Sequence, residues 1–141
     1  MDEPKQMQHM TLRHIVSFPF IMVVIFPLAI LDIFVEVYHR ICFRLYGITL
    51  LKRGDYIRFD RHKLSYLNPV ERLFCMYCAY ANGFFPYAEA IASRTEKYWC
   101  AIKHKKYEGM HEPAHHKEFA EYGDEQGYKD IKSHRDEENF L

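Results

Sequence analysis

Glycine is scarce in this chain, with six in 141 residues, and none lies in a phosphate-binding glycine loop. A nucleophile elbow and a zinc-protease helix motif are missing as well. The sequence therefore indicates no catalytic residue and no small-molecule substrate, and we expect a protein that is not an enzyme.

Charge is missing from one long stretch near the N-terminus. Residues 15–31 carry no charged side chain, and residues 15–38 carry only Asp32 and Glu36. Seventeen residues of helix span about 26 Å, close to the lower limit for a hydrocarbon core. No small-x-small cleavage site follows, which argues against a cleaved signal peptide. We expect a membrane span, while Pro19 and Pro27 leave an interfacial or re-entrant segment open.

The net charge of zero conceals three unequal blocks. Residues 1–39 carry two basic and four acidic side chains, residues 40–106 thirteen and five, and residues 107–141 four and ten. Because the basic block starts where the apolar stretch ends, anionic membrane lipid is the simplest partner, and nucleic acid is not expected. The positive-inside tendency places the C-terminal side in the cytoplasm.

The pattern of helix signals predicts a mainly α fold. Asp32, Glu36, Arg40 and Arg44 recur every four residues, so the apolar helix should continue past the membrane to a stop at Gly47. Residues 55–67 predict a short strand or extended segment. Asn68, Pro69 and Glu71 form a helix start, and Asn82-Gly83 a stop. A second helix from Pro86 to about His104 should complete an antiparallel hairpin.

These signals divide the chain into four parts. They are a leader (1–14), a membrane and juxtamembrane helix (15–46), a cysteine- and histidine-bearing helical domain (47–106) and an acidic, irregular tail (107–141).

The strongest chemical signal is a pair of short motifs. Cys75 and Cys78 form Cys-x-x-Cys, and Cys100 and His104 form Cys-x-x-x-His. In a reducing compartment such spacings suit tetrahedral zinc, because thiolates and a neutral imidazole are strong donors for that ion. We expect zinc on these four residues, with Cys42 as the alternative fourth ligand, although a straight hairpin would not bring Cys78 and Cys100 face to face.

Three other interpretations stay open. The cysteines could form a redox pair or simply fill a core. Iron is the alternative metal, either on the cysteines or on Glu36 and His39, whose Glu-x-x-His spacing occurs in di-iron bundles, with His62 as a further candidate. Glu89 and Glu96 lie at i,i+7 on the second predicted helix, and His115-His116 is interpreted as a loop rather than a ligand cluster.

Four segments together resemble a family of small bacterial membrane-associated proteins of uncharacterised function. They include Cys-Met-Tyr-Cys-Ala-Tyr-Ala-Asn-Gly at 75–83 and Tyr-Trp-Cys-Ala-Ile-Lys-His at 98–104, with further matches at 46–48 and 56–64. The resemblance implies a bacterial origin and an N-terminal apolar helix, and it transfers no catalytic residues.

The combined expectation is a membrane-tethered, zinc-binding accessory or assembly protein of a membrane complex. It would sit at the bacterial inner membrane with most of the chain in the cytoplasm. A redox or iron-dependent membrane enzyme is the second hypothesis, and a metal-free scaffold on the membrane surface is the third.

Overall fold

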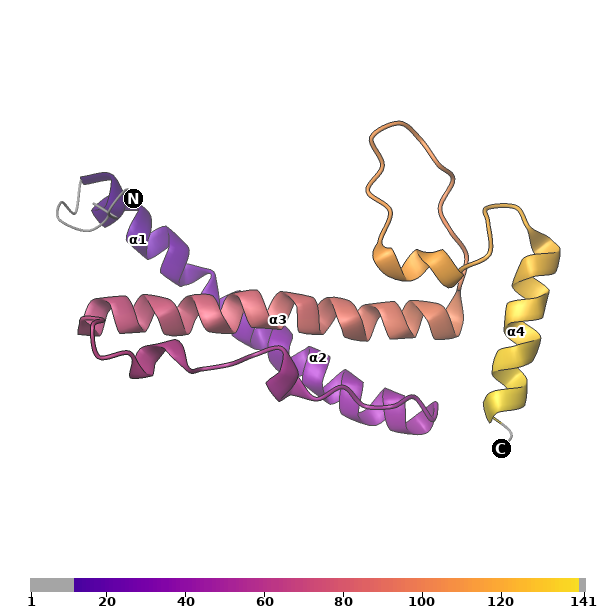
Figure 1. The fold of residues 1–141 in the computed structure, drawn as a ribbon, viewed down its shortest axis with the longest axis horizontal. Coiled ribbons are helices and arrows are strands. Elements are labelled where there is room, and N and C mark those ends of the chain that lie inside the picture. Colours follow the sequence, from indigo (N-terminus) through magenta and orange to yellow (C-terminus); the bar gives the residue numbers. More distant parts are fainter. Residues whose placement is uncertain (1–11, 140–141) are drawn as a thin grey trace.

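The computed structural model describes residues 12–139 and shows a mainly helical chain (Figure 1). Its α-helices and 3₁₀ turns follow one another in this order: α1 (Leu12–Val23), α2 (Ile25–Leu45), η1 (Arg53–Asp55), η2 (Arg61–Lys63), α3 (Pro69–Trp99), η3 (Ala114–Glu118) and α4 (Glu125–Asn139). Within that range the only β pairing is an isolated bridge between Ile102 and Ala120.

The apolar stretch forms α1 and α2, which meet at Val24. Pro27 explains the break, because its ring nitrogen cannot donate to the carbonyl of Val23 one turn earlier. Together Ile15–Leu45 is long and apolar enough to cross a membrane, as judged by length and composition. Only 6% of its most apolar window is buried in the protein, so it is not the core helix of a soluble domain. Gly47, with φ of 68°, lies just after the helix end, as predicted.

α2 and α3 run in the same direction and cross (Figure 1). Residue numbers rise together along the contacts that join α3 to the apolar helices and to the residue that follows them: Ile21–Tyr77, Asp32–Tyr80, Glu36–Tyr87 and Tyr46–Tyr98. A parallel pair needs a connection that returns along its length. The segment 46–68 makes this return, and we call it the connector.

A small core lies where α2, α3 and the connector meet. Phe43, Phe84 and Ile57 contribute one buried side chain from each of the three segments. Gly83 permits this packing, because a Cβ at that position would lie 2.6 Å from the carbonyl oxygen of Tyr56. The close approach of the connector to α3 therefore requires glycine.

The predicted helical hairpin is wrong, because α3 is one continuous helix of 31 residues. It begins at the predicted capping box of Asn68 and Glu71, but it continues through Gly83 and Pro86 to Trp99. Gly83 allows the connector to pack closely on α3, and it does not act as a helix C-cap. Pro86 removes one helix hydrogen bond, a loss that neighbouring turns and tertiary contacts offset. The second predicted helix therefore does not start a new element, and it ends before His104.

The predicted irregular tail is wrong in its last part, which folds into α4. Asp124 caps this helix by accepting a hydrogen bond from the backbone of Gly127 at 3.0 Å. Glu125 and Lys129 add an i,i+4 ion pair at 2.5 Å. The guanidinium of Arg135 lies 5.2 Å from the ring centre of Tyr98, which docks α4 beside the end of α3 (Figure 1).

The sequence predicts a short strand or extended segment over residues 55–67. The structure forms η2 and irregular backbone there, with no strand in those residues.

Candidate metal centre

The end of α3 and the segment that follows it form a closed loop. Ala101 has φ of 48°, a left-handed conformation that turns the chain sharply after Trp99. The backbone of Ala120 then donates to Ala101 at 2.9 Å and accepts from Lys103 at 2.8 Å. These two hydrogen bonds hold residues 114–120 close to the end of α3, where the loop begins. As a result, η3 lies against the last turns of α3.

The loop brings two adjacent histidines onto one carboxylate. Nε2 of His115 lies 2.8 Å from Oε2 of Glu96, and Nε2 of His116 lies 3.2 Å from Oε1 of the same residue. The three possible ligand atoms lie within 4.8 Å of one another. Within residues 12–139 this is the one group of three or more His, Cys, Asp or Glu side chains that could hold a metal ion.

His116 is fixed in the protein interior. Its side chain is 1% exposed and stacks on Phe119, with ring centres 4.9 Å apart. Its Nδ1 is buried without a hydrogen-bond partner in the protein. An unsatisfied buried polar atom costs about 1–3 kcal/mol, and such atoms call for a structural or functional explanation.

The ring of His115 is held from both sides. Ser93 donates its hydroxyl proton to the carbonyl of Glu89 at 2.7 Å, and its oxygen lies 3.1 Å from Nδ1 of His115. Ser93 therefore fixes the ring nitrogen that faces away from Glu96, which directs Nε2 toward the carboxylate. Such an arrangement is the usual support of a histidine that binds a metal ion.

The electrostatics of Glu96 favour bound positive charge. Burial alone would raise the pKa of this carboxyl group, but hydrogen bonds from His115 and His116 outweigh it and hold the pKa below its usual value. The carboxylate is therefore ionised at neutral pH. It can balance part of the charge of a divalent ion.

The donor set matches known metal chemistry. Zinc binds imidazole nitrogen and carboxylate oxygen at about 2.0–2.2 Å, so tetrahedral ligand atoms lie about 3.3 Å apart. The separations of 2.8 and 3.2 Å around Glu96 are close to that value. Two histidines and one carboxylate occur in zinc sites that keep a fourth position open, and also in non-haem iron(II) sites.

The structure does not assemble the predicted cysteine site. Cys75, Cys78 and Cys100 belong to α3 or directly follow it, and the separation of 22 positions between the last two corresponds to about 33 Å of helix. Cys42 lies on α2, and all four cysteines are outside the one ligand group found in the described part of the chain. A continuous α3 therefore does not bring the two motifs together into the expected four-ligand geometry.

His104 is closer to the candidate centre than the cysteines are. Its ring centre lies 5.9 Å from that of His116, but it is exposed and does not belong to the ligand group. His62 lies on η2, away from that group, with a buried Nδ1 that has no hydrogen-bond partner.

Glu36 and His39 lie together, yet their donor atoms have other partners. Oε2 of Glu36 accepts from the hydroxyl of Tyr87 at 2.8 Å, and Oε1 accepts from Arg40 at 2.6 Å. Nε2 of His39 accepts from the backbone of Leu51 at 3.0 Å, so its lone pair is already used. These two predicted ligands instead help to hold the connector between α2 and α3.

The residues of the candidate centre, Glu96, His115 and His116, were visible in the sequence as separate features. The sequence predicts Glu96 on a helix and His115-His116 in a loop, without relating the two. His115 follows Glu96 by 19 positions, and no helical or strand periodicity relates the two. No protein-family model matches this sequence, and no curated protein or solved structure matches it significantly. The centre is therefore interpreted from its own geometry.

Proposed function

We propose that this protein is a membrane-attached metal-binding accessory or assembly protein that holds zinc on Glu96, His115 and His116. The observation that carries the proposal is the shared carboxylate of Glu96, contacted by Nε2 of both histidines while Ser93 holds Nδ1 of His115. A second residue that fixes the far nitrogen of a histidine is the usual support of a metal ligand.

The apolar α1 and α2 support membrane attachment. We place the protein at the bacterial inner membrane with the metal centre on the cytoplasmic side, where an anionic leaflet would attract the basic block that follows the apolar stretch. The metal centre is built at the far end of α3 from the contact with α1. The protein would thus present a metal-stabilised loop, residues 102–120, to a membrane complex.

Metal analysis of the purified full-length chain tests the proposal. We expect one zinc per chain in the wild type and loss of stoichiometric zinc in His116→Ala. The matched control is His111→Ala, because His111 is an exposed histidine in the same loop. Equal zinc contents in wild type and His116→Ala, or no zinc in either, would overturn the proposed centre.

Two further measurements separate the alternatives. A variant with all four cysteines replaced by serine should keep its zinc, whereas zinc on the cysteines would be lost. Loading with iron(II) under anaerobic conditions tests the second candidate, an iron-dependent membrane enzyme, which the same two-histidine, one-carboxylate set favours. Tighter binding of iron than of zinc would support that candidate and contradict ours.

A further inference from the structure

A continuous apolar face extends along the whole of α1 and α2. It runs from Leu12 to Leu45, and the side chains between them include Val16, Phe26, Ile30 and Ile41, each more than half exposed. These 34 residues correspond to about 50 Å of helix, whereas the hydrocarbon core of a bilayer is about 30 Å thick. The apolar face is therefore longer than a perpendicular span requires.

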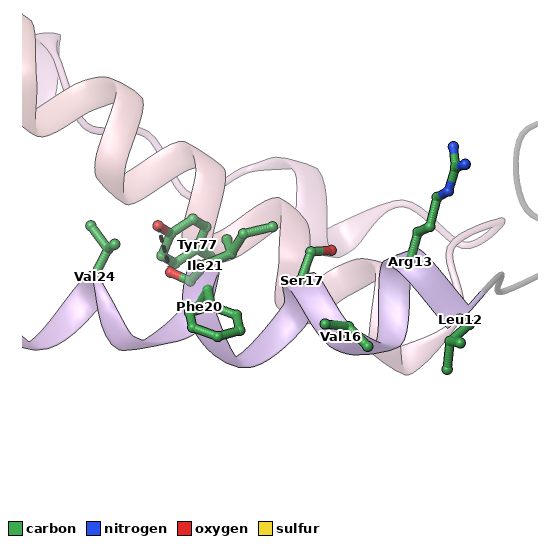
Figure 2. Close-up of a pocket in the computed structure, with 8 residues that line it drawn as sticks. All are labelled: Leu12, Arg13, Val16, Ser17, Phe20, Ile21, Val24 and Tyr77. Atoms are coloured by element: carbon green, nitrogen blue, oxygen red, sulfur yellow. Dashed lines mark hydrogen bonds between the residues drawn. The ribbon is translucent and has the colours of Figure 1, made fainter.

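The opposite face of α2 is covered by protein, and that of α1 contacts the first part of α3. Asp32, His39 and Phe43 of α2 are buried there against α3 and the connector. On α1, Figure 2 shows Leu12, Val16 and Phe20 projecting from one side of the helix and Arg13, Ser17 and Ile21 from the other. The second side is the one on which Tyr77 of α3 donates to the carbonyl of Ile21 at 3.1 Å. The two helices thus turn an apolar face outward and a face of mixed polar and apolar side chains toward the rest of the protein.

The connector lies beside the part of the helix that a span would place in hydrocarbon. Arg53 of the connector contacts Asp32, and the start of α3 that follows the connector contacts α1, where the rings of Phe18 and Phe74 lie 5.4 Å apart. Between these two points the connector carries Arg58, Asp60 and η2, which packs against α3.

Hydrocarbon would not tolerate this segment. The backbone of residues 57–60 is irregular, and lipid-exposed irregular backbone does not occur within the core of a bilayer. Charged side chains are also unfavourable at that depth. A perpendicular span of Ile15–Leu31 would expose both to lipid.

We infer that α1 and α2 lie in the plane of the membrane surface, with their outer apolar face in one leaflet and α3, the connector and the metal centre on the water side. Exposed Arg13, Arg40 and Arg44 flank the apolar face, where they can contact lipid phosphates. The partner is thus the surface of a bilayer that contains anionic phospholipid. This inference rests on the membrane attachment proposed above and not on the metal centre.

Depth measurements by spin labelling test the orientation. Val16→Cys, Ile30→Cys and Ile41→Cys are each made in full-length chains whose four native cysteines are serine. The chains are bound to vesicles of phosphatidylcholine and phosphatidylglycerol, and oxygen and nickel accessibilities give the depth of each label. We expect all three labels at one similar depth, about 5–10 Å below the headgroups.

A perpendicular span gives a different pattern. Val16 and Ile41 are 25 residues apart, so their labels would differ by about 38 Å along the membrane normal, with Ile30 between them. A label at Arg58→Cys is the control on the connector, and it should be accessible to water in our arrangement and protected in a span. Three different depths with a protected Arg58→Cys label would overturn the inference while leaving membrane attachment intact. Failure of the wild type to bind the vesicles would instead contradict the attachment itself.

Discussion

The guanidinium of Arg53 and the carboxylate of Asp32 face each other through two parallel hydrogen bonds, Nη1–Oδ1 and Nη2–Oδ2, each 2.5 Å long. The two residues are 21 positions apart, and they join the connector to the buried side of α2. The hydroxyl of Tyr80 donates to Oδ2 of Asp32 at 2.7 Å, which adds α3 to the same contact. The carboxylate of Asp32 therefore joins α2, the connector and α3.

Removing the guanidinium should loosen the connector. Arg53→Ala leaves the mostly buried carboxylate of Asp32 without its charged partner, and we expect a loss of about 2–3 kcal/mol in the free energy of unfolding. Denaturant titration of the protein in mild detergent measures this change. Arg58→Ala is the matched control, because Arg58 is an exposed arginine of the same connector. Similar losses in the two variants would contradict a specific role for Arg53.

A methyl group at position 83 should separate the connector from α3. The added Cβ of Gly83→Ala would lie 2.6 Å from the carbonyl oxygen of Tyr56 and 2.9 Å from the Cα of Ile57, and backbone atoms cannot move aside cheaply. We expect a destabilisation of about 1–3 kcal/mol, even though alanine favours helix. Gly54→Ala should be nearly neutral, because no atom lies within 4 Å of its added Cβ. Thermal unfolding followed by circular dichroism compares the two variants, and an unchanged midpoint in Gly83→Ala would show that the contact is not formed.

The local signals in the sequence predicted helix ends well and helix interiors less well. The capping box at Asn68 and the stop near Gly47 depend on neighbouring residues alone, so a short pattern is enough to find them. Gly83 and Pro86 gave the opposite result, because Gly83 resembles a helix stop and Pro86 a helix start, yet both lie inside α3. What decides their role is the connector that packs on Gly83, and that contact comes from a segment more than twenty residues earlier.

The candidate centre depended even more on contacts distant in sequence. The cysteine motifs were locally convincing, yet a continuous α3 keeps Cys78 and Cys100 far apart. Glu96 meets the histidine pair only because Ala101 adopts a positive φ and Ala120 returns to the helix end. Alanine carries no sequence signal for such a turn, so this meeting could not be derived from residue types and spacing.

Ser93 provides a test of how the centre is supported. Its hydroxyl lies 3.1 Å from Nδ1 of His115, the ring nitrogen that faces away from Glu96. Ser93→Ala removes this contact without removing a ligand, and we expect zinc affinity to fall about 10–100-fold. Competition with a chromophoric chelator measures the affinity. Ser65→Ala, at an exposed serine in the connector, should bind zinc as the wild type does. An unchanged affinity in Ser93→Ala would mean that the serine does not orient the ligand.

The depressed pKa of Glu96 predicts how the stability of the metal-free protein depends on pH. A carboxyl group whose pKa is lowered by folding binds protons more weakly in the folded state than in the unfolded chain. The stability that this ionised carboxylate contributes is therefore fully present above the ordinary value of 4.5, and it disappears as the pH falls through the lowered folded-state pKa.

Glu96→Gln removes this titration, so the wild type should be the more stable of the two near neutral pH. The difference should shrink as the pH falls below 4.5, because a protonated carboxyl group resembles the amide. Denaturant titrations in the presence of a chelator measure the two free energies across this range, with Glu108→Gln in the exposed loop as the control. A difference that stays constant with pH would show that the ionised carboxylate does not stabilise the loop.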